Sequence, residues 1–294
     1  MTDKFQLVGI RPAPPQPPKA RTPWYHSLPP VSAAVLALIV LGCVLSPLFV
    51  PHDPSYMDLA SCNLPPCREF PFGTDAMGRD VFSMIWSGGR LSLCIGLLAT
   101  AISTAVAVMI GSISGCAPRW LDALLMRATE LALSVPSLLV TIFLQAILGK
   151  PSVLSMSLVI GLTGWTSIAK VVRTEVRQLR GSEYVLAART MGGSFFHILR
   201  CHLAPNFASA ISFMVIMSIR SAIIAESTLS FMGIGLQLEL ISWGSMLSLA
   251  ENALLSGSWW VIVGPGAFLV VTLLCITNLA DALRSGRDRR SSNL

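Results

Sequence analysis

Charged residues are scarce in this sequence. Aspartate, glutamate, lysine and arginine make up 12% of the 294 residues, whereas 53% are hydrophobic and the mean hydropathy is +0.67. Soluble domains typically contain about twice that share of charge, interleaved with apolar residues at helical or strand period. This scarcity excludes an ordinary soluble domain and indicates a membrane protein.

Residues for nucleotide hydrolysis and metal chemistry are also missing. The sequence has no phosphate-binding loop of the form G-x-x-x-x-G-K-[ST]. Its histidines, His26, His52, His197 and His202, occur neither as H-E-x-x-H nor in another ligand spacing. We therefore expect no catalysis by this chain, no metal site and no cofactor of its own.

Long apolar runs, by contrast, are abundant. Several are close to the length of about 17 to 25 residues that a helix needs to cross a bilayer, and one of them also contains Arg220 and Glu226. The expected spans are Val31–Val50, Leu91–Cys116, Leu131–Leu148, Val153–Ala169, Asn206–Phe231 and Trp259–Leu279. Backbone groups have no water partner in hydrocarbon, and the runs lack the period-two alternation of barrel strands. We predict an all-α membrane protein with six transmembrane helices.

Basic residues are distributed unevenly among the segments outside these spans. If the N-terminus is cytoplasmic, sixteen of the 21 lysines and arginines lie inside: four in the N-terminal tail, two after the second span, six after the fourth and four after the sixth. The positive-inside rule describes this asymmetry. It predicts cytoplasmic N- and C-termini, and it accounts for the net charge of +6 without a nucleic acid partner.

The expected spans divide the chain into five segments. They are a proline-rich cytoplasmic tail (1–30), a first transmembrane helix (31–50), an extracytoplasmic segment (51–90), a transmembrane core (91–284) with a cytoplasmic loop (170–206), and a basic C-terminal tail (285–294). Prolines make the extracytoplasmic segment extended or rich in turns, and its residues 80–86 are expected to form a short interfacial helix.

Two of the seven cysteines, Cys62 and Cys67, lie in the segment that we place outside. In an oxidising compartment they could form a disulfide that closes a small loop. A metal-binding pair and two free thiols are the alternatives.

Small residues recur at four-residue spacing in the second span, at Ser103, Ala107, Gly111 and Gly115. This spacing places them on one helical face, where a neighbouring backbone can approach closely. We interpret the stripe as ordinary packing within a helical bundle. Pro136, inside the third span, predicts a kink there.

The loop between the fourth and fifth spans is polar but patterned. Good helix formers occupy Glu175–Arg180 and Glu183–Arg189. Gly192 and Gly193 then interrupt them, and an amphipathic run from Phe195 to Leu203 follows before Pro205. This pattern predicts a helix–turn–helix on the cytoplasmic face. Such a hairpin needs a surface to pack against, either lipid headgroups or a partner protein.

The paired Ala187 and Ala188, Gly192 four residues later, and His202 followed by Pro205-Asn206 form a specific pattern. It resembles the coupling loop of the inner-membrane permeases of ABC importers, in the oligopeptide, dipeptide and nickel branch. Small alanines permit close helix contact, and Gly192 permits a tight turn. The resemblance implies that these residues contact an ATPase; a basic loop lying on anionic headgroups is the alternative.

The loop departs from the family pattern at Leu186, where the family has a glutamate. Glu183 lies three residues earlier, nearly one helical turn, and so stays on roughly the same side. We therefore include Glu183 and Gly193 among the expected ATPase-coupling residues.

Three further segments resemble the same permeases. They are Phe72–Asp80 in the expected outer segment, Ala225–Gly235 with the later Ser242-Trp243-Gly244, and Asn278–Arg284 near the C-terminus. With the coupling loop, the similarity extends over roughly residues 32–284.

The resemblance implies a type I ABC importer permease fold and a multi-pass location in the inner membrane. It also implies four partner subunits: a homologous second permease, two cytoplasmic ATPases that bind ATP and magnesium, and an extracytoplasmic substrate-binding protein. Permeases of this branch carry peptides, nickel or small metal chelates. The alternative class is an ion-coupled secondary transporter, which would have acidic residues at mid-membrane and no docking loop.

Arg220 and Glu226 are costly residues for a span, because a charge in hydrocarbon must face protein, water or an interface. Six residues apart, they point about 120° away from each other. We expect Arg220 to face the pathway or a partner helix, with snorkelling to the interface as the alternative. Glu226 is expected either at the pathway or at the outer interface.

Overall fold

A computed structural model of the chain describes residues 29–180, 190, 204–236 and 240–291. These residues contain no β-strand, only an isolated bridge between Thr74 and Asp80. The α-helices are α1 (Pro30–Phe49), α2 (Val81–Cys116), α3 (Arg119–Ser134), α4 (Ser137–Leu148), α5 (Val153–Gly164), α6 (Thr166–Leu179), α9 (Ala204–Phe231), α10 (Trp243–Ser248), α11 (Ala250–Ser256) and α12 (Trp260–Ser291), with a 3-10 turn η2 (Leu59–Ser61).

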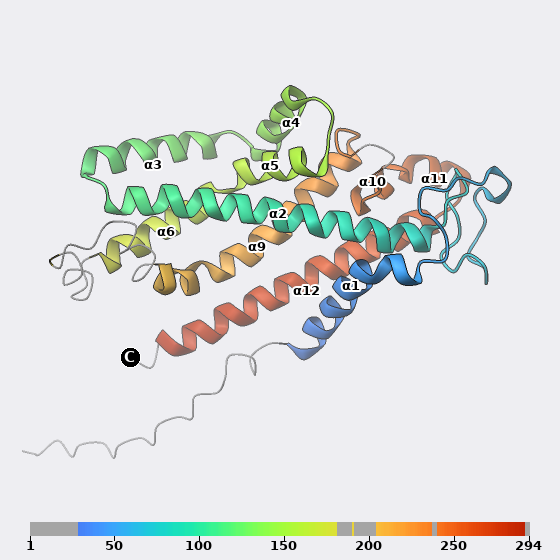
Figure 1. The fold of residues 1–294 in the computed structure, drawn as a ribbon, viewed down its shortest axis with the longest axis horizontal. Helices are drawn as coiled ribbons and strands as arrows, with labels where there is room; N and C mark the ends of the chain where they lie inside the picture. The colour runs from blue at the N-terminus through green and yellow to red at the C-terminus, as the bar shows by residue number, and fades with distance from the viewer. Residues whose placement is uncertain (1–28, 181–189, 191–203, 237–239, 292–294) are drawn as a thin grey trace, which may run out of the picture.

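Helix α2 runs the length of the bundle, and its most extensive contacts are with α6, α5 and α9 (Figure 1). Glycines allow this closeness: a Cβ on Gly111 would lie 2.6 Å from the carbonyl oxygen of Ala169 in α6. Likewise, a Cβ on Gly115 would lie 2.7 Å from Val176, and one on Gly96 would lie 2.7 Å from Ile223 in α9. The small-residue stripe thus packs within the chain, and the interpretation as bundle packing is confirmed.

Four of the described helices, α1, α2, α9 and α12, are individually long and apolar enough to cross a bilayer. The number becomes six if α3 with α4, and α5 with α6, each count as one bent span. This agrees with an all-α membrane protein. Apolar side chains on α1 such as Val31 and Leu48 are largely exposed, as expected for a surface that faces lipid.

The third and fourth expected spans are broken helices and not continuous ones. The axes of α3 and α4 differ in direction by 89° at Pro136, which is far more than the expected kink. Pro136 is the N-cap of α4, so the chain leaves helical conformation there and a new helix begins. The 50° break at Trp165 has no proline. It follows Gly161 and Gly164, where glycine lets α5 approach α2 closely and weakens the helix.

The segment before α2 is folded. Asp80 caps α2 by accepting from the backbone N–H groups of Phe82 and Ser83, so the expected short helix over 80–86 is the first part of α2. Asp75 and Arg79 form a buried ion pair at 2.7 Å. Trp260 Nε1 donates to the carbonyl of Thr74 at 3.0 Å and fastens the segment to α12.

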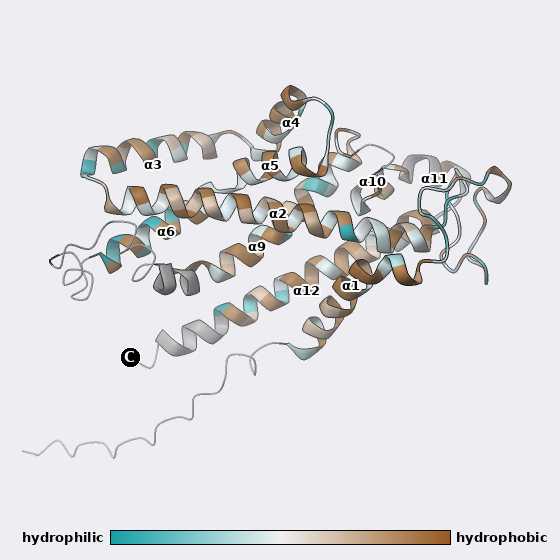
Figure 2. Cartoon of the chain, in the orientation of Figure 1, coloured by the Kyte–Doolittle hydropathy of each residue, from teal (hydrophilic) through white to brown (hydrophobic). Residues whose placement is uncertain are grey.

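Polar residues gather at the two ends of the bundle, and apolar residues lie between them (Figure 2). One end carries residues 51–80 with α10 and α11. The other carries the start of α3, the end of α6 and the start of α9 (Figure 1). Basic side chains Arg119, Arg173, Arg177 and Arg180 belong to this second end, which the positive-inside rule assigns to the cytoplasm.

Candidate functional site

A cavity of about 700 Å³ opens where the two bent pairs face α9. Its wall includes a residue next to each break: Pro136, between α3 and α4, and Gly164, the last residue of α5 before the break at Trp165. The other lining residues are Ala99, Ser103, Ala132, Leu133, Val135, Ser137, Leu138, Thr141, Ile160, Thr163, Thr166, Ser167, Ile168, Phe213, Met214, Met217, Ser218, Ser221, Ala222, Ile224, Ala225 and Thr228. The two bends therefore shape the concave surface of the cavity.

The cavity wall is rich in hydroxyl groups, and none of the described residues that line it is charged. Thr141 and Thr163 hydroxyls lie 3.2 Å apart and also donate to carbonyls of their own helices. Ser221 and Thr228 likewise donate to carbonyls within α9. Such hydroxyls satisfy their proton internally and keep oxygen lone pairs that can accept from a ligand.

Ser103 differs from the other hydroxyl residues of the wall. Its side chain is 2% exposed, and its Oγ has no hydrogen-bond partner within the part of the chain that the structure describes. An unpaired buried hydroxyl costs free energy. Ser103 therefore offers both a donor and an acceptor at the cavity.

Glu226 was expected at the pathway or the outer interface, and it lies instead inside the protein with none of its surface exposed. Its Oε1 accepts from Ser230 Oγ at 2.9 Å, and its Oε2 accepts from Ser92 Oγ of α2 at 3.0 Å. Ser227 Oγ lies at 3.4 Å from the same Oε2. We call these four residues the Glu226 cluster. It ties α9 to α2, and Glu226 does not line the cavity.

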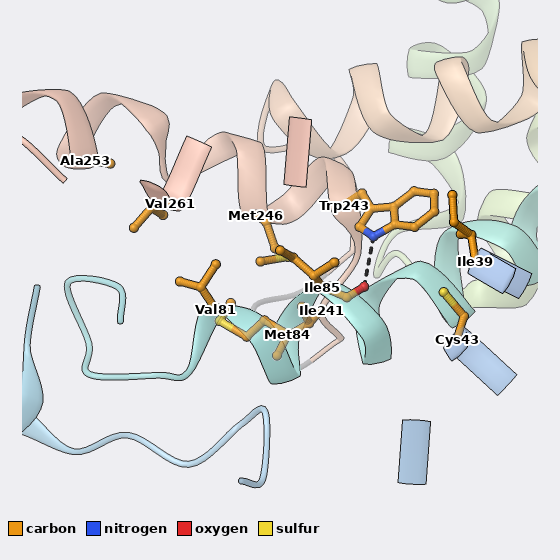
Figure 3. Packing of buried hydrophobic residues seen from close by; sticks show 10 residues of the cluster. All are labelled: Ile39, Cys43, Val81, Met84, Ile85, Ile241, Trp243, Met246, Ala253 and Val261. Carbon is orange, nitrogen blue, oxygen red and sulfur yellow. Dashed lines mark hydrogen bonds between the residues drawn. The ribbon is translucent and has the colours of Figure 1, made fainter. Parts of the chain in front are cut away.

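Helix α10 completes the surroundings of the Glu226 cluster. The backbone N–H of Trp243 donates to Ser92 Oγ at 3.2 Å. The ring Nε1 of Trp243 donates to the carbonyl of Ile85 at 2.9 Å (Figure 3). The Trp243 side chain lies in a hydrophobic core to which α1, α2, α10 and α12 contribute. Gly244 sits so close to α9 that a Cβ would lie 2.5 Å from Ser227 Cα. The Ser242-Trp243-Gly244 motif thus docks α10 on the cluster.

Arg220 also does not line the cavity. Its side chain is half-buried, and its Nε is enclosed with no hydrogen-bond partner among the described residues. The expectation that it faces the pathway or a partner helix stays a prediction.

The expected coupling residues Glu183, Ala187, Ala188, Gly192, Gly193 and His202 lie outside the described residues. Pro205 belongs to the first turn of α9. Helix α6, before this loop, and α9, after it, have their loop-proximal ends at the same end of the bundle (Figure 1). The loop is therefore attached to two helices that also line the cavity.

Cys62 and Cys67 are free thiols in the structure. Cys62 is half-buried and Cys67 is exposed, and the Sγ of Cys67 accepts from the backbone N–H of Phe70 at 3.4 Å. The described residues contain no group of three or more histidine, cysteine or acidic side chains that could hold a metal ion.

Sequence reasoning missed the hydroxyl-lined wall, although a signal was present. Ser218, Ser221 and Thr228 are three and seven residues apart, which places them on one face of α9. Thr163 and Ser167 are four residues apart, on either side of the break at Trp165. Hydroxyls repeated on one face of an apolar span indicate a surface that faces something other than lipid. The partner of Glu226 on α2 had no such local signal, because Ser92 precedes Glu226 by 134 residues.

Comparison with known proteins points in one direction. The family model of the inner-membrane component of binding-protein-dependent transport systems matches residues 107–292. The dipeptide transport system permease protein DppC of Bacillus subtilis is 36% identical over 254 residues, which cover 86% of this chain and 79% of that protein. The oligopeptide transport system permease protein OppC of the same organism is 34% identical over 263 residues, covering 90% and 86%. A putative peptide permease protein of Brucella suis is 35% identical over 265 residues, covering 88% and 87%.

Proposed function

The chain belongs to the inner-membrane components of binding-protein-dependent transport systems, and from this membership we propose that its hydroxyl-lined cavity forms half of the route by which an ATP-driven importer moves peptides. The protein is an ABC importer permease of the peptide branch, a multi-pass protein of the inner membrane that is not itself an enzyme.

Peptide cargo fits the chemistry of the cavity wall. All peptides share backbone N–H and C=O groups, whereas their side chains vary in charge and size. Ser103 can donate to a peptide carbonyl or accept from a peptide N–H, and Thr141 and Thr163 can accept from a peptide N–H. The described part of the wall carries no charge that would repel peptide side chains of either sign. The names of the relatives, a dipeptide and an oligopeptide permease, support the same cargo.

Nickel and metal chelates, the other cargoes carried in this branch, have less support. Nickel is bound well by imidazole and by other nitrogen and oxygen ligands, and the lining residues that the structure describes include no histidine, cysteine or acidic side chain. We therefore favour peptides, with uptake of free nickel as the observation that would decide for the alternative.

The coupling loop is proposed to dock on the ATPase subunits through Glu183, Ala187, Ala188, Gly192, Gly193, His202 and Pro205. Support comes from the loop pattern and from the position of its flanking helices, α6 and α9, at the basic end of the bundle. ATP-driven closure of the ATPases would move the loop, and the helices attached to it would switch the cavity from one face of the membrane to the other.

The remaining partners follow from the same assembly. A homologous second permease would supply the facing half of the route, and an extracytoplasmic binding protein would deliver the peptide. Two cytoplasmic ATPases would bind ATP with magnesium, since this sequence contains no phosphate-binding loop.

Uptake by proteoliposomes containing the full transporter tests the proposal. Labelled dipeptide should accumulate only with ATP and the binding protein. Ser103→Ala should slow uptake about two- to twelvefold, because one hydrogen bond contributes about 0.5–1.5 kcal/mol. Thr277→Val is the matched control: its hydroxyl donates to the Leu273 carbonyl within α12, and it does not line the cavity. Equal uptake by the Ser103 variant and the parent would remove Ser103 from the route, and uptake without ATP would refute the importer assignment.

A further inference from the structure

Asp122 lies at the centre of a polar cluster that joins three helices at the basic end of the bundle. Its Oδ1 accepts from Arg173 Nε at 2.5 Å and its Oδ2 from Arg173 Nη2 at 2.6 Å, so the two side chains meet side-on through two hydrogen bonds. Ser114 Oγ of α2 donates to Oδ1 at 2.6 Å, and Arg177 Nη1 lies 3.4 Å from Oδ2. We call these four residues the Asp122 clamp.

The ion pair between Asp122 and Arg173 is shielded from solvent, and water therefore competes little for its hydrogen bonds. The side chain of Asp122 is 8% exposed and that of Arg173 is 24% exposed. A two-bond arginine–carboxylate contact of this kind fixes distance and orientation together. By comparison, the Arg127–Glu130 pair on α3 has side chains that are 82% and 51% exposed and is a single contact at 3.2 Å.

Helix α3 has little else to hold it against the bundle. Its buried residues are Asp122 and Thr129, and the Thr129 hydroxyl donates to its own helix at Leu125. Apolar side chains of α3 such as Trp120 and Leu131 are largely exposed. Its position relative to α6 therefore depends on the Asp122 clamp more than on apolar packing.

Both helices joined by the clamp reach the cavity at their other ends. Helix α6 contributes Thr166, Ser167 and Ile168 near its start, and its last residue, Leu179, leads toward the coupling loop. Helix α3 contributes Ala132 and Leu133 near its end, ten residues or about 15 Å along the helix from Asp122. A displacement of α6 that pulls on Asp122 would thus move a second wall of the cavity.

We propose that Asp122 is a positioning residue that transmits movement of the coupling loop from α6 to α3, so that both walls of the cavity move together during transport. The proposal rests on the proposed function, since it takes residues 181–203 as the segment that the ATPases move. The ion pair with Arg173 is the main link, Arg177 assists, and Ser114 anchors the link to α2.

The experiment compares peptide imported with ATP hydrolysed, in proteoliposomes that contain the complete transporter with its binding protein. Asp122→Asn keeps the size of the side chain but removes its charge and one acceptor oxygen. We expect the peptide imported per ATP to fall at least about threefold while binding-protein-stimulated hydrolysis continues, in line with the effect of substitutions along coupling networks. Arg173→Gln should behave likewise, and Arg177→Gln should have a smaller effect. Asp122→Glu, which restores the charge, should recover much of the coupling.

Glu130→Gln is the control, because it breaks an exposed ion pair on the same helix and should leave the ratio unchanged. An unchanged ratio in Asp122→Asn would overturn the proposal. The proposal would also be overturned if Asp122→Asn lost assembled complex, ATP hydrolysis and import in parallel, and if Asp122→Glu did not restore them. That result would mean that Asp122 has a purely structural role. Failure of the parent transporter to import peptide with ATP would instead refute the proposed function and, with it, the inference.

Discussion

Glu226 illustrates how a span can contain an acidic residue without exposing it to lipid. Three serine hydroxyls, from Ser92, Ser227 and Ser230, surround its carboxyl group in place of water. Each hydroxyl makes a modest contribution, but leaving a buried partner unpaired is costly. The arrangement also explains why serines accompany the glutamate in the Ala225–Gly235 segment: Ser230 follows it by one helical turn.

Removal of Ser92 should therefore destabilise the protein. In Ser92→Ala, both Glu226 and the backbone N–H of Trp243 lose a partner, and we expect a loss of about 1–3 kcal/mol. Thermal unfolding of the purified protein in detergent measures this as a lower midpoint. Ser134→Ala is the control, since Ser134 is exposed and bonded only within its own helix, and a surface change of this kind stays within about 0.5 kcal/mol. Equal midpoints for the two variants would contradict the assigned role of the cluster.

At this scale the sequence pointed to the costly residues but not to their partners. Glu226 stands out because charge is expensive in an apolar run, which is a local property. Its contact with Ser92, like that of Asp122 with Arg173, joins residues far apart in the chain. Nothing in the local pattern of either span determines such a pairing, because it depends on how helices cross.

Among the helices, those made of one uniform apolar run agree best with expectation. Helix α1 begins at Pro30 and ends at Phe49, close to the expected Val31–Val50. Helix α2 begins at Val81, ten residues before the apolar run that predicted it, because its cap is Asp80 and its first turns pack on α10 and α12. The 89° break at Pro136 and the 50° break at Trp165 exceed what a single proline or glycine predicts, since tertiary packing sets the size of a bend.

Contact between α2 and α6 should be intolerant of added volume. Gly111→Val would place its Cβ 2.6 Å from the backbone oxygen of Ala169, which cannot move aside as a side chain can. We expect overpacking to cost about 1–3 kcal/mol, seen as a lower unfolding midpoint in detergent. Met109→Val introduces the same residue at a site that is 64% exposed on the same helix, and it should change the midpoint little. A Gly111 variant as stable as the Met109 variant would show that the two helices are free to separate.

Considered as a whole, the molecule has two polar ends that differ in composition. One carries arginines from α3 and α6, and the other carries the folded segment 51–80, in which the charges of Asp75 and Arg79 cancel. The positive-inside rule predicts that the basic end is cytoplasmic, and the coupling proposal takes this orientation as its premise.

Labelling with a membrane-impermeant maleimide on spheroplasts tests this orientation. Cys67, which is exposed in segment 51–80, should react from outside, and Cys67→Ser should remove that signal. In the Cys67→Ser background, Gln178→Cys places a thiol at an exposed position near the end of α6. It should react only after permeabilisation. Reaction of that thiol in intact spheroplasts would invert the topology.

The hydrogen bonds between the segment 51–80 and the last helix have a consequence for the timing of biosynthesis. Thr74 and Asn63 bond to Trp260 and Ser258, which are translated 186 and 195 residues later. At about 5–20 residues per second, the ribosome needs roughly 10–40 s to reach them. In the predicted topology the segment is exported during that interval, before the residues that hold it have been made. Segment 51–80 therefore acquires its final conformation late, when α12, the last helix to be synthesised, packs against it.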